Sequence, residues 1–239
     1  PLHGLRRLVF PIGHLHDMGG AMALLVLLCA GAPTEVSRWR IGASVLGSGA
    51  LVCLFASHVR AELLAMGVAL IVLLALTKRF AFLGGLLLLG VAVMAMSTVL
   101  QERFVDVYYV ATFTEPPRGW DSIGSSRFDI WRHTWAQFVQ QRPASIAFGT
   151  GLGGAVSLWK SDPHLDYLKL GVQLGPVAPL SLLVVQGLAV RDALRSASSH
   201  GRLVVALMVL GTVACFLSNA YFSRAALLYL WWALTGAAL

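Results

Sequence analysis

Four side chains of this sequence, three arginines and one histidine, stand out as candidates to bind an anion or accept a proton. Arg60 stands in "SHVRAELL", at the start of an apolar stretch. Arg127 and Arg132 lie in "SSRFDIWRHTW", and His164 follows Pro163 in "SDPHLDYLKL". Arginine can bind phosphate oxygens through two parallel hydrogen bonds, and a neutral imidazole can take a proton from a hydroxyl near pH 7. Together they could hold a phosphorylated substrate and activate a hydroxyl nucleophile.

Arg60 has two interpretations. At the first turn of a helix the macrodipole disfavours a cation, but the free N–H groups and the guanidinium would together bind an anion. The alternative is an arginine that anchors the helix end at a membrane interface, and the residue type by itself favours that alternative.

His164 is predicted to lie in the first turn of a helix, with Asp162 as N-cap and Pro163 at the first helical position. There the positive end of the dipole disfavours imidazolium and keeps the ring neutral, as a general base requires. A solvated loop histidine without a catalytic role is the commoner occurrence of this residue type.

The composition predicts an all-α, polytopic membrane protein. Hydrophobic residues make up 57% of the chain and charged residues 12%, and the mean hydropathy is +0.75. A soluble domain has about 25% charged residues. A membrane span needs roughly 20 apolar residues. Seven apolar segments approach that length: 18–32, 41–57, 61–77, 80–99, 174–190, 203–218 and 223–239. Because the sequence begins at Pro1, with neither a Met nor a signal-like pattern, we also expect that the first residues of the native protein are missing from it.

These segments predict three regions: transmembrane helices in 1–99, a large loop in 100–173, and transmembrane helices in 174–239. The short connections carry seven Lys and Arg residues on one side and four on the other. The positive-inside rule makes the first side cytoplasmic and the loop periplasmic. The net charge of +7 is scattered over the inter-helix segments, so membrane topology explains it better than a nucleic-acid partner does.

The predicted loop contains two amphipathic helices. The first covers 125–143, where Ser125 or Ser126 would cap it and Pro143 would end it. An aromatic stripe along it, typical of an interfacial helix, consists of Phe128, Trp131, Trp135 and Phe138. The second helix is the one that begins near Asp162.

Between these helices, Gly149, Gly151 and Gly154 have a G-x-G-x-x-G spacing. No strand–helix unit surrounds it, so a turn whose backbone approaches a ligand or a neighbouring helix is favoured over a dinucleotide site. D-x-D, H-E-x-x-H, P-loop and G-x-S-x-G motifs do not occur, and the three cysteines lie in apolar runs. We therefore predict no metal and no cofactor, with arginine stabilising any phosphate leaving group.

Four stretches resemble, in order, the O-antigen ligase and polymerase superfamily of bacterial envelope glycosyltransferases. "SHVRAELLAMGVALIVLLAL" is similar to the family's arginine-bearing start of a span, although His58 and Val59 separate Ser57 from Arg60. "SRFDIWRHTWAQFVQQRPASIAFGTGLGG" resembles its Arg-x-x-x-Trp helix and the following glycine turn. "PHLDYLKLGVQLGPVAPLSLLV" resembles its histidine element, with Leu165 where Asn or Ser is usual, and "ALLYLWWALTGAAL" resembles its closing span.

The resemblance implies a metal-independent glycosyltransferase in the bacterial inner membrane, with its active site on the periplasmic face. The donor would be a glycan on undecaprenyl diphosphate, and the acceptor lipid A–core or another glycan. Carried over by motif, Arg60 and Arg127 would bind the diphosphate, with Arg132 as a helper, and His164 would activate the acceptor hydroxyl.

Two alternatives stay open. The same donor could serve an O-antigen polymerase or a protein O-oligosaccharyltransferase. A transporter of lipid-linked glycans without catalysis is the alternative from another class. Transporters carry charged residues at midplane depth, whereas here Arg, His and Asp residues gather outside the predicted spans.

Overall fold

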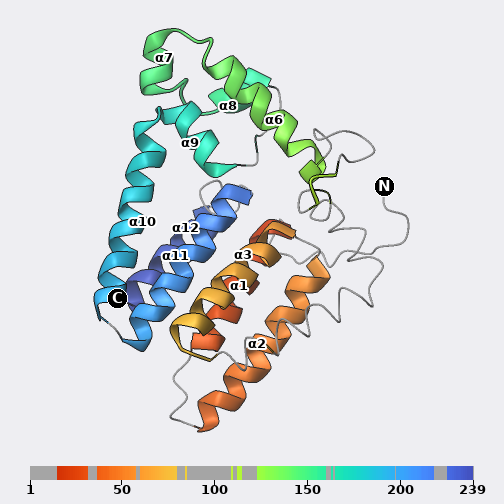
Figure 1. Cartoon of the computed structure of the whole chain (residues 1–239), viewed down its shortest axis with the longest axis vertical. Coiled ribbons are helices and arrows are strands. Elements are labelled where there is room, and N and C mark those ends of the chain that lie inside the picture. Colours follow the sequence, from red (N-terminus) through yellow and green to blue (C-terminus); the bar gives the residue numbers. More distant parts are fainter. Residues whose placement is uncertain are drawn as a thin grey trace. The chain divides into compact units, whose positions relative to one another are not determined.

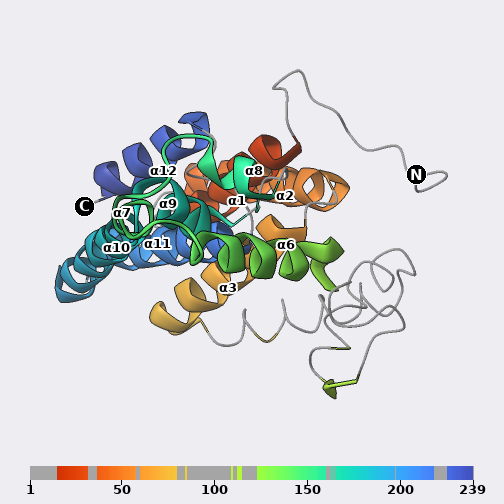
Figure 2. The same ribbon diagram turned by 90° about the horizontal axis from the view of Figure 1, so that it is seen from above.

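The structure is a computed structural model, and the residues that it describes form helices and the turns beside them (Figures 1 and 2). It describes residues 15–31, 37–57, 60–79, 123–159, 165–196, 198–217 and 225–238, with positions 84, 109, 112–114 and 163. Every secondary-structure element in these ranges is a helix, so the predicted all-α class is confirmed for them. The chain divides into two compact units, residues 1–80 with 184–239 and residues 81–183.

The first unit is a bundle in which α1 (Leu15–Gly31) is central. It packs against α2 (Ser37–Ser57), α3 (Arg60–Leu76), α11 (Ser199–Leu217) and α12 (Ala225–Ala238). These helices run side by side in Figure 1. Because α1, α3 and α11 are apolar on all sides, they form stable helices only where neighbours or lipid cover them.

Small residues allow the helices of this bundle to approach closely. Gly20 of α1 faces Leu227, and Gly211 of α11 faces the ring of Trp231 so closely that a Cβ would overlap with it. Trp231 is fully buried, and its indole N–H donates to the Leu207 carbonyl at 2.8 Å. A glycine opposite a large side chain is a common device for packing helices without a cavity.

The helix α10 (Val177–Ser196) begins in the second unit and ends in the first. Helices α10 and α11 are long and apolar enough to cross a membrane. The apolar parts of α1, α2, α3 and α12 are shorter. Apart from position 84, the predicted span at 80–99 lies outside the described residues.

The second unit contains α6 (Ile123–Phe138), α7 (Pro143–Phe148), α8 (Gly154–Trp159) and α9 (Asp166–Leu174). Its small core brings one residue from each of three helices together: Phe138, Ala155 and Val172. Partly buried side chains pack around this core: Ile146, Leu158 and Leu168. Each of the four helices thus contributes at least one apolar side chain.

The limits of α6 differ from the prediction. The helix already begins at Ile123, so Ser125 and Ser126 lie within it, and it ends at Phe138 instead of reaching Pro143. Arg142 has φ −57° and ψ 145°, the extended geometry that a residue before proline prefers, and Pro143 is the first residue of α7. Proline here starts a second helix, because its missing N–H is no loss at that position.

The start of α9 was also predicted wrongly. The helix begins at Asp166, with Leu165 as N-cap at φ −145° and ψ 102°. Its first helical bond runs from the Lys169 N–H to the Leu165 carbonyl, at 3.0 Å. The carbonyl of Pro163 instead accepts a hydrogen bond from the Trp131 indole N–H, so it does not start the helix. Position 164 therefore precedes α9, and His164 itself lies outside the described residues.

Candidate functional site

The second unit holds the chain segment before His164 against α6. The Trp131 indole N–H donates to the carbonyl of Pro163, and Pro163 is buried. Arg127 stands one turn before Trp131 on α6, and residues four apart share a helix face. Arg127 is half-buried there. The contact thus brings the residue next to His164 onto the face of α6 that carries Arg127.

Arg132 occupies a different side of α6. It stands five positions after Arg127, which is about 140° around the helix axis at 3.6 residues per turn. Its side chain is 62% exposed, and its Nη2 lies 3.1 Å from Asp129 Oδ1. The two arginines therefore do not point at one ligand from the same side of α6.

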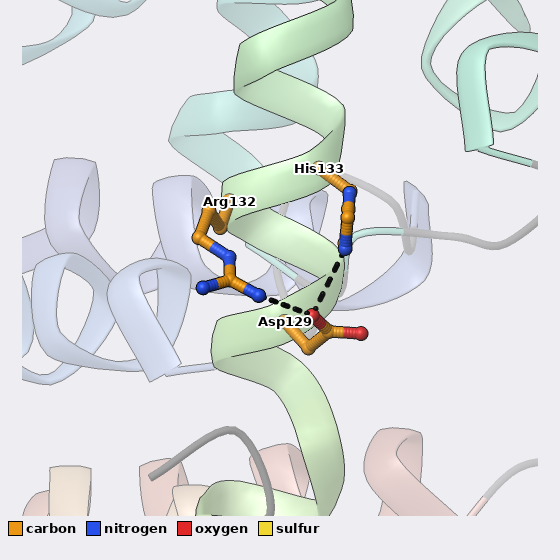
Figure 3. A network of polar contacts seen from close by, with 3 residues as sticks. All are labelled: Asp129, Arg132 and His133. Atoms are coloured by element: carbon orange, nitrogen blue, oxygen red, sulfur yellow. Dashed lines mark hydrogen bonds and ion pairs between the residues drawn. The ribbon is translucent and has the colours of Figure 1, made fainter.

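Asp129 is shared between two side chains of the following turn. His133 Nε2 also lies 3.1 Å from Asp129 Oδ1, so a single carboxylate oxygen receives Arg132 and His133 (Figure 3). All three groups are partly or largely exposed, and such surface pairs contribute about 0.2–1 kcal/mol. The Asp129 carboxylate therefore lowers the net positive charge of this side of α6.

Arg60 is the first residue of α3, in the first unit. Its side chain is outside the described part of the structure, but its position in the helix can be read from the backbone. One turn later begins a stripe of exposed apolar residues formed by Leu64, Val68 and Ile71. Position 60 stands in the register of that stripe. A neighbouring face, about 100° around the helix, carries Ala61, Ala65 and Ala69 and is buried in the bundle.

Glu62 is a buried carboxylate that the sequence interpretation did not single out. It lies in the first turn of α3 and is only 1% exposed. An acidic residue at this position interacts favourably with the positive end of the helix dipole. The signal available in the sequence was an acidic residue two positions after Arg60 in an otherwise apolar helix.

The glycine turn contacts a neighbouring helix. The Thr150 N–H and hydroxyl both donate to the Val172 carbonyl, at 2.8 and 2.9 Å, and the Gly151 N–H donates to the Gln173 carbonyl at 3.0 Å. Gly149 has φ +84°, and a Cβ there would overlap with the Gln173 backbone. Of the two roles predicted for this turn, the approach to a neighbouring helix is confirmed.

Among the described residues, no group of three or more His, Cys, Asp or Glu side chains is placed to hold a metal ion. Among the described residues of the second unit, the candidate site consists of the Arg127 face of α6 and the segment that Trp131 holds.

These features define a class of helical protein. It has apolar helices long enough to span a membrane, and its second unit carries Arg127 beside the segment that Trp131 holds. The family model described as O-antigen ligase matches residues 43–183, more than half of the 239 residues. The chain belongs to the O-antigen ligase family, within the ligase and polymerase superfamily. The comparison with curated proteins finds no match.

Family membership gives the chain a glycosyltransferase-type activity in lipopolysaccharide biosynthesis, with a lipid-linked glycan donor, and a place in the inner membrane. The matched region includes Arg60, the whole of α6 with Arg127, and the segment around Pro163.

Proposed function

We propose that this chain is an O-antigen ligase that moves a glycan from undecaprenyl diphosphate to lipid A–core. It acts as a multi-pass protein of the inner membrane, with residues 100–173 on the periplasmic face. The hydrogen bond from Trp131 to the Pro163 carbonyl carries the proposal, because it joins the segment of His164 to the Arg127 face of α6.

In the proposed reaction, the acceptor hydroxyl oxygen forms a bond to the anomeric carbon of the glycan. The bond between that carbon and the diphosphate oxygen breaks, and its electron pair leaves on the diphosphate. His164 takes the hydroxyl proton. Arg60 and Arg127 bind the diphosphate and stabilise its growing charge, a role that arginine fills without a metal ion. Arg132 is assigned a lesser, long-range contribution because Asp129 already binds it.

The test is transfer by the protein reconstituted in liposomes, with a lipid-linked glycan donor and lipid A–core acceptor. We expect His164→Ala, Arg60→Ala and Arg127→Ala each to lower the initial rate by about 10²-fold or more, as loss of a general base or of a charge-stabilising group does. Arg142→Ala is the matched control, because Arg142 is an exposed arginine of the same unit that precedes α7. Full activity of the His164 and Arg60 variants would overturn the mechanism.

The product identifies the acceptor. Glycan on lipid A–core supports ligation, whereas longer lipid-linked chains would mean polymerisation and glycosylated protein would mean an oligosaccharyltransferase. Movement of intact donor across the bilayer without a product would mean transport. The rate should not change when EDTA removes divalent metal, and a loss that Mg²⁺ or Mn²⁺ restores would contradict the arginine-based mechanism.

A further inference from the structure

The second unit exposes two large apolar side chains on one short stretch. Phe148, at the end of α7, is 81% exposed, and Leu152, in the glycine turn, is 88% exposed. A single exposed apolar residue is normal on a protein surface. These two are the most exposed large hydrophobic residues described between 123 and 183, and they are four positions apart.

Backbone contacts hold this stretch against the start of α10. Gly175 has φ +83°, and a Cβ there would overlap with the Ala147 carbonyl, the residue before Phe148. On the other side, Gly151 bonds to the Gln173 carbonyl. Phe148 and Leu152 are therefore fixed beside the residues that lead into α10, which begins at Val177.

The stretch with Phe148 and Leu152 and the residues that lead into α10 together form an apolar corner. Both segments that meet there lack charged side chains. Residues 143–159 and 170–190 contain no Asp, Glu, Lys, Arg or His. Two water-exposed segments of this length would each carry several charged residues at the usual share of about 25%. Transfer of this corner from water to lipid costs little free energy, since no charged side chain has to be desolvated.

The surface of α10 continues this apolar corner. Its outward side chains at the first turns include Leu180 and Val184, both 60% exposed, and little of the helix is buried within the chain. A helix of this length and hydropathy is covered by acyl chains when it crosses a bilayer. Lipid that covers the first turn of α10 also reaches the residues held beside it.

We propose that Phe148 and Leu152 insert into the boundary between headgroups and acyl chains, in the leaflet where α10 enters the membrane. The occupant of this surface is lipid, because the surface is continuous with a candidate span and carries no charge for a protein partner to match. The proposal rests on α10 crossing the bilayer, as in the proposed function. This membrane anchor, formed by Phe148 and Leu152, would keep the glycine turn at the depth of a lipid-linked diphosphate. It would hold α9 and the Trp131–Pro163 contact there as well.

The test places one environment-sensitive label at a time on the protein in liposomes. The cysteines at 29, 53 and 215 are replaced by alanine, and single cysteines are introduced as Phe148→Cys and Leu152→Cys. Val184→Cys on α10 is the control for a lipid environment, and Arg142→Cys, at the exposed start of α7, is the control for water. Each label is then quenched by doxyl-labelled lipid and, separately, by iodide in solution.

We expect the labels at 148 and 152 to follow the one at 184: strong quenching by doxyl lipid and several-fold weaker quenching by iodide than at 142. Iodide quenching as strong as at 142 would overturn the anchor. Protection from both quenchers would also overturn it, because protein would then cover the surface. A label at 184 that iodide reaches and lipid does not would instead refute the span at α10, so the two failures are distinguishable.

Discussion

The indole of Trp131 is the residue on which the candidate site depends most. Its N–H donates to the Pro163 carbonyl, across 32 positions of sequence, and Pro163 is buried. A buried carbonyl without a donor costs about 1–3 kcal/mol, whereas a made hydrogen bond contributes about 1 kcal/mol. The bond therefore both stabilises the unit and determines where the chain before His164 lies.

Trp131→Phe keeps most of the aromatic surface and removes the donor. We expect the free energy of unfolding to fall by about 1–3 kcal/mol, and the transfer rate to fall as well because the His164 segment loses its position. Thermal unfolding and initial rates measure the two effects. Trp135→Phe is the control, since the exposed Trp135 contacts the Phe138 ring at a centroid distance of 6.0 Å. Equal losses in both variants would contradict the role of the hydrogen bond.

The two arginines of α6 should differ in their effect on transfer. Arg127 is half-buried on the face of Trp131, and Arg132 is exposed and paired with Asp129. We expect Arg127→Ala to lower the rate by about 10²-fold or more, and Arg132→Ala by less than about tenfold. Initial rates at saturating donor measure both, and an equally severe Arg132 variant would show that the exposed side of α6 faces the substrate.

At the scale of elements, the glycine turn joins α7, α8 and the end of α9. Gly149 and Gly151 both have positive φ, +84° and +85°. Only Gly149 lies against backbone, that of Gln173, whereas open space surrounds the Cβ position of Gly151. Conformation alone is the reason for glycine at 151, and conformation together with close approach is the reason at 149.

Alanine substitutions at these two positions distinguish backbone strain at positive φ from steric overlap with the backbone of α9. Gly151→Ala should cost about 1–2 kcal/mol, for an L-residue at positive φ. Gly149→Ala should cost more and should also open the bonds of Thr150 to Val172, because the backbone of α9 must move. Hydrogen exchange of the Thr150 and Gly151 amides measures this opening. Equal exchange rates in the two variants would mean that the overlap is relieved without moving α9.

The elements also show where local sequence signals failed. The proline at 143 was taken as a helix end, but its preference for the first helical position makes it the start of α7. Asp162 and Pro163 look like a helix start, yet α9 begins only at Asp166. Because that helix starts later, its dipole no longer explains a neutral ring at His164.

At the scale of the molecule, the first unit depends on close packing between α11 and α12. Gly211 leaves room for the Trp231 ring, which fills the interior of the bundle. Any larger residue at 211 forces the ring off its rotamer or separates the helices, which typically costs about 1–3 kcal/mol.

Gly211→Ala should therefore lower the free energy of unfolding in detergent by about 1–3 kcal/mol. Gly236→Ala is its control on α12, because nothing lies within 4 Å of the Cβ position there. The control should be neutral or more stable by about 0.5–1 kcal/mol, since alanine favours a helix over glycine. Chemical unfolding followed by Trp fluorescence compares the two, and a stable Gly211 variant would contradict the tight α11–α12 contact.

The sequence by itself determined the helical class, because apolar runs of this length satisfy their backbone only as helices. It also determined the family, through motifs that follow one another in order. These are properties of composition, periodicity and residue order, which one stretch of chain carries alone. The roles of Arg127 and of the segment at 161–176 stay predictions.

Only the tertiary structure decided which of these features lie together. The Trp131–Pro163 bond and the late start of α9 depend on a contact between residues far apart in sequence. The exposed pair at 148 and 152 likewise gains meaning only because Gly175 and Gly151 hold it at the start of α10. Local propensity cannot predict such contacts, since the packing of distant segments decides which donor reaches a carbonyl.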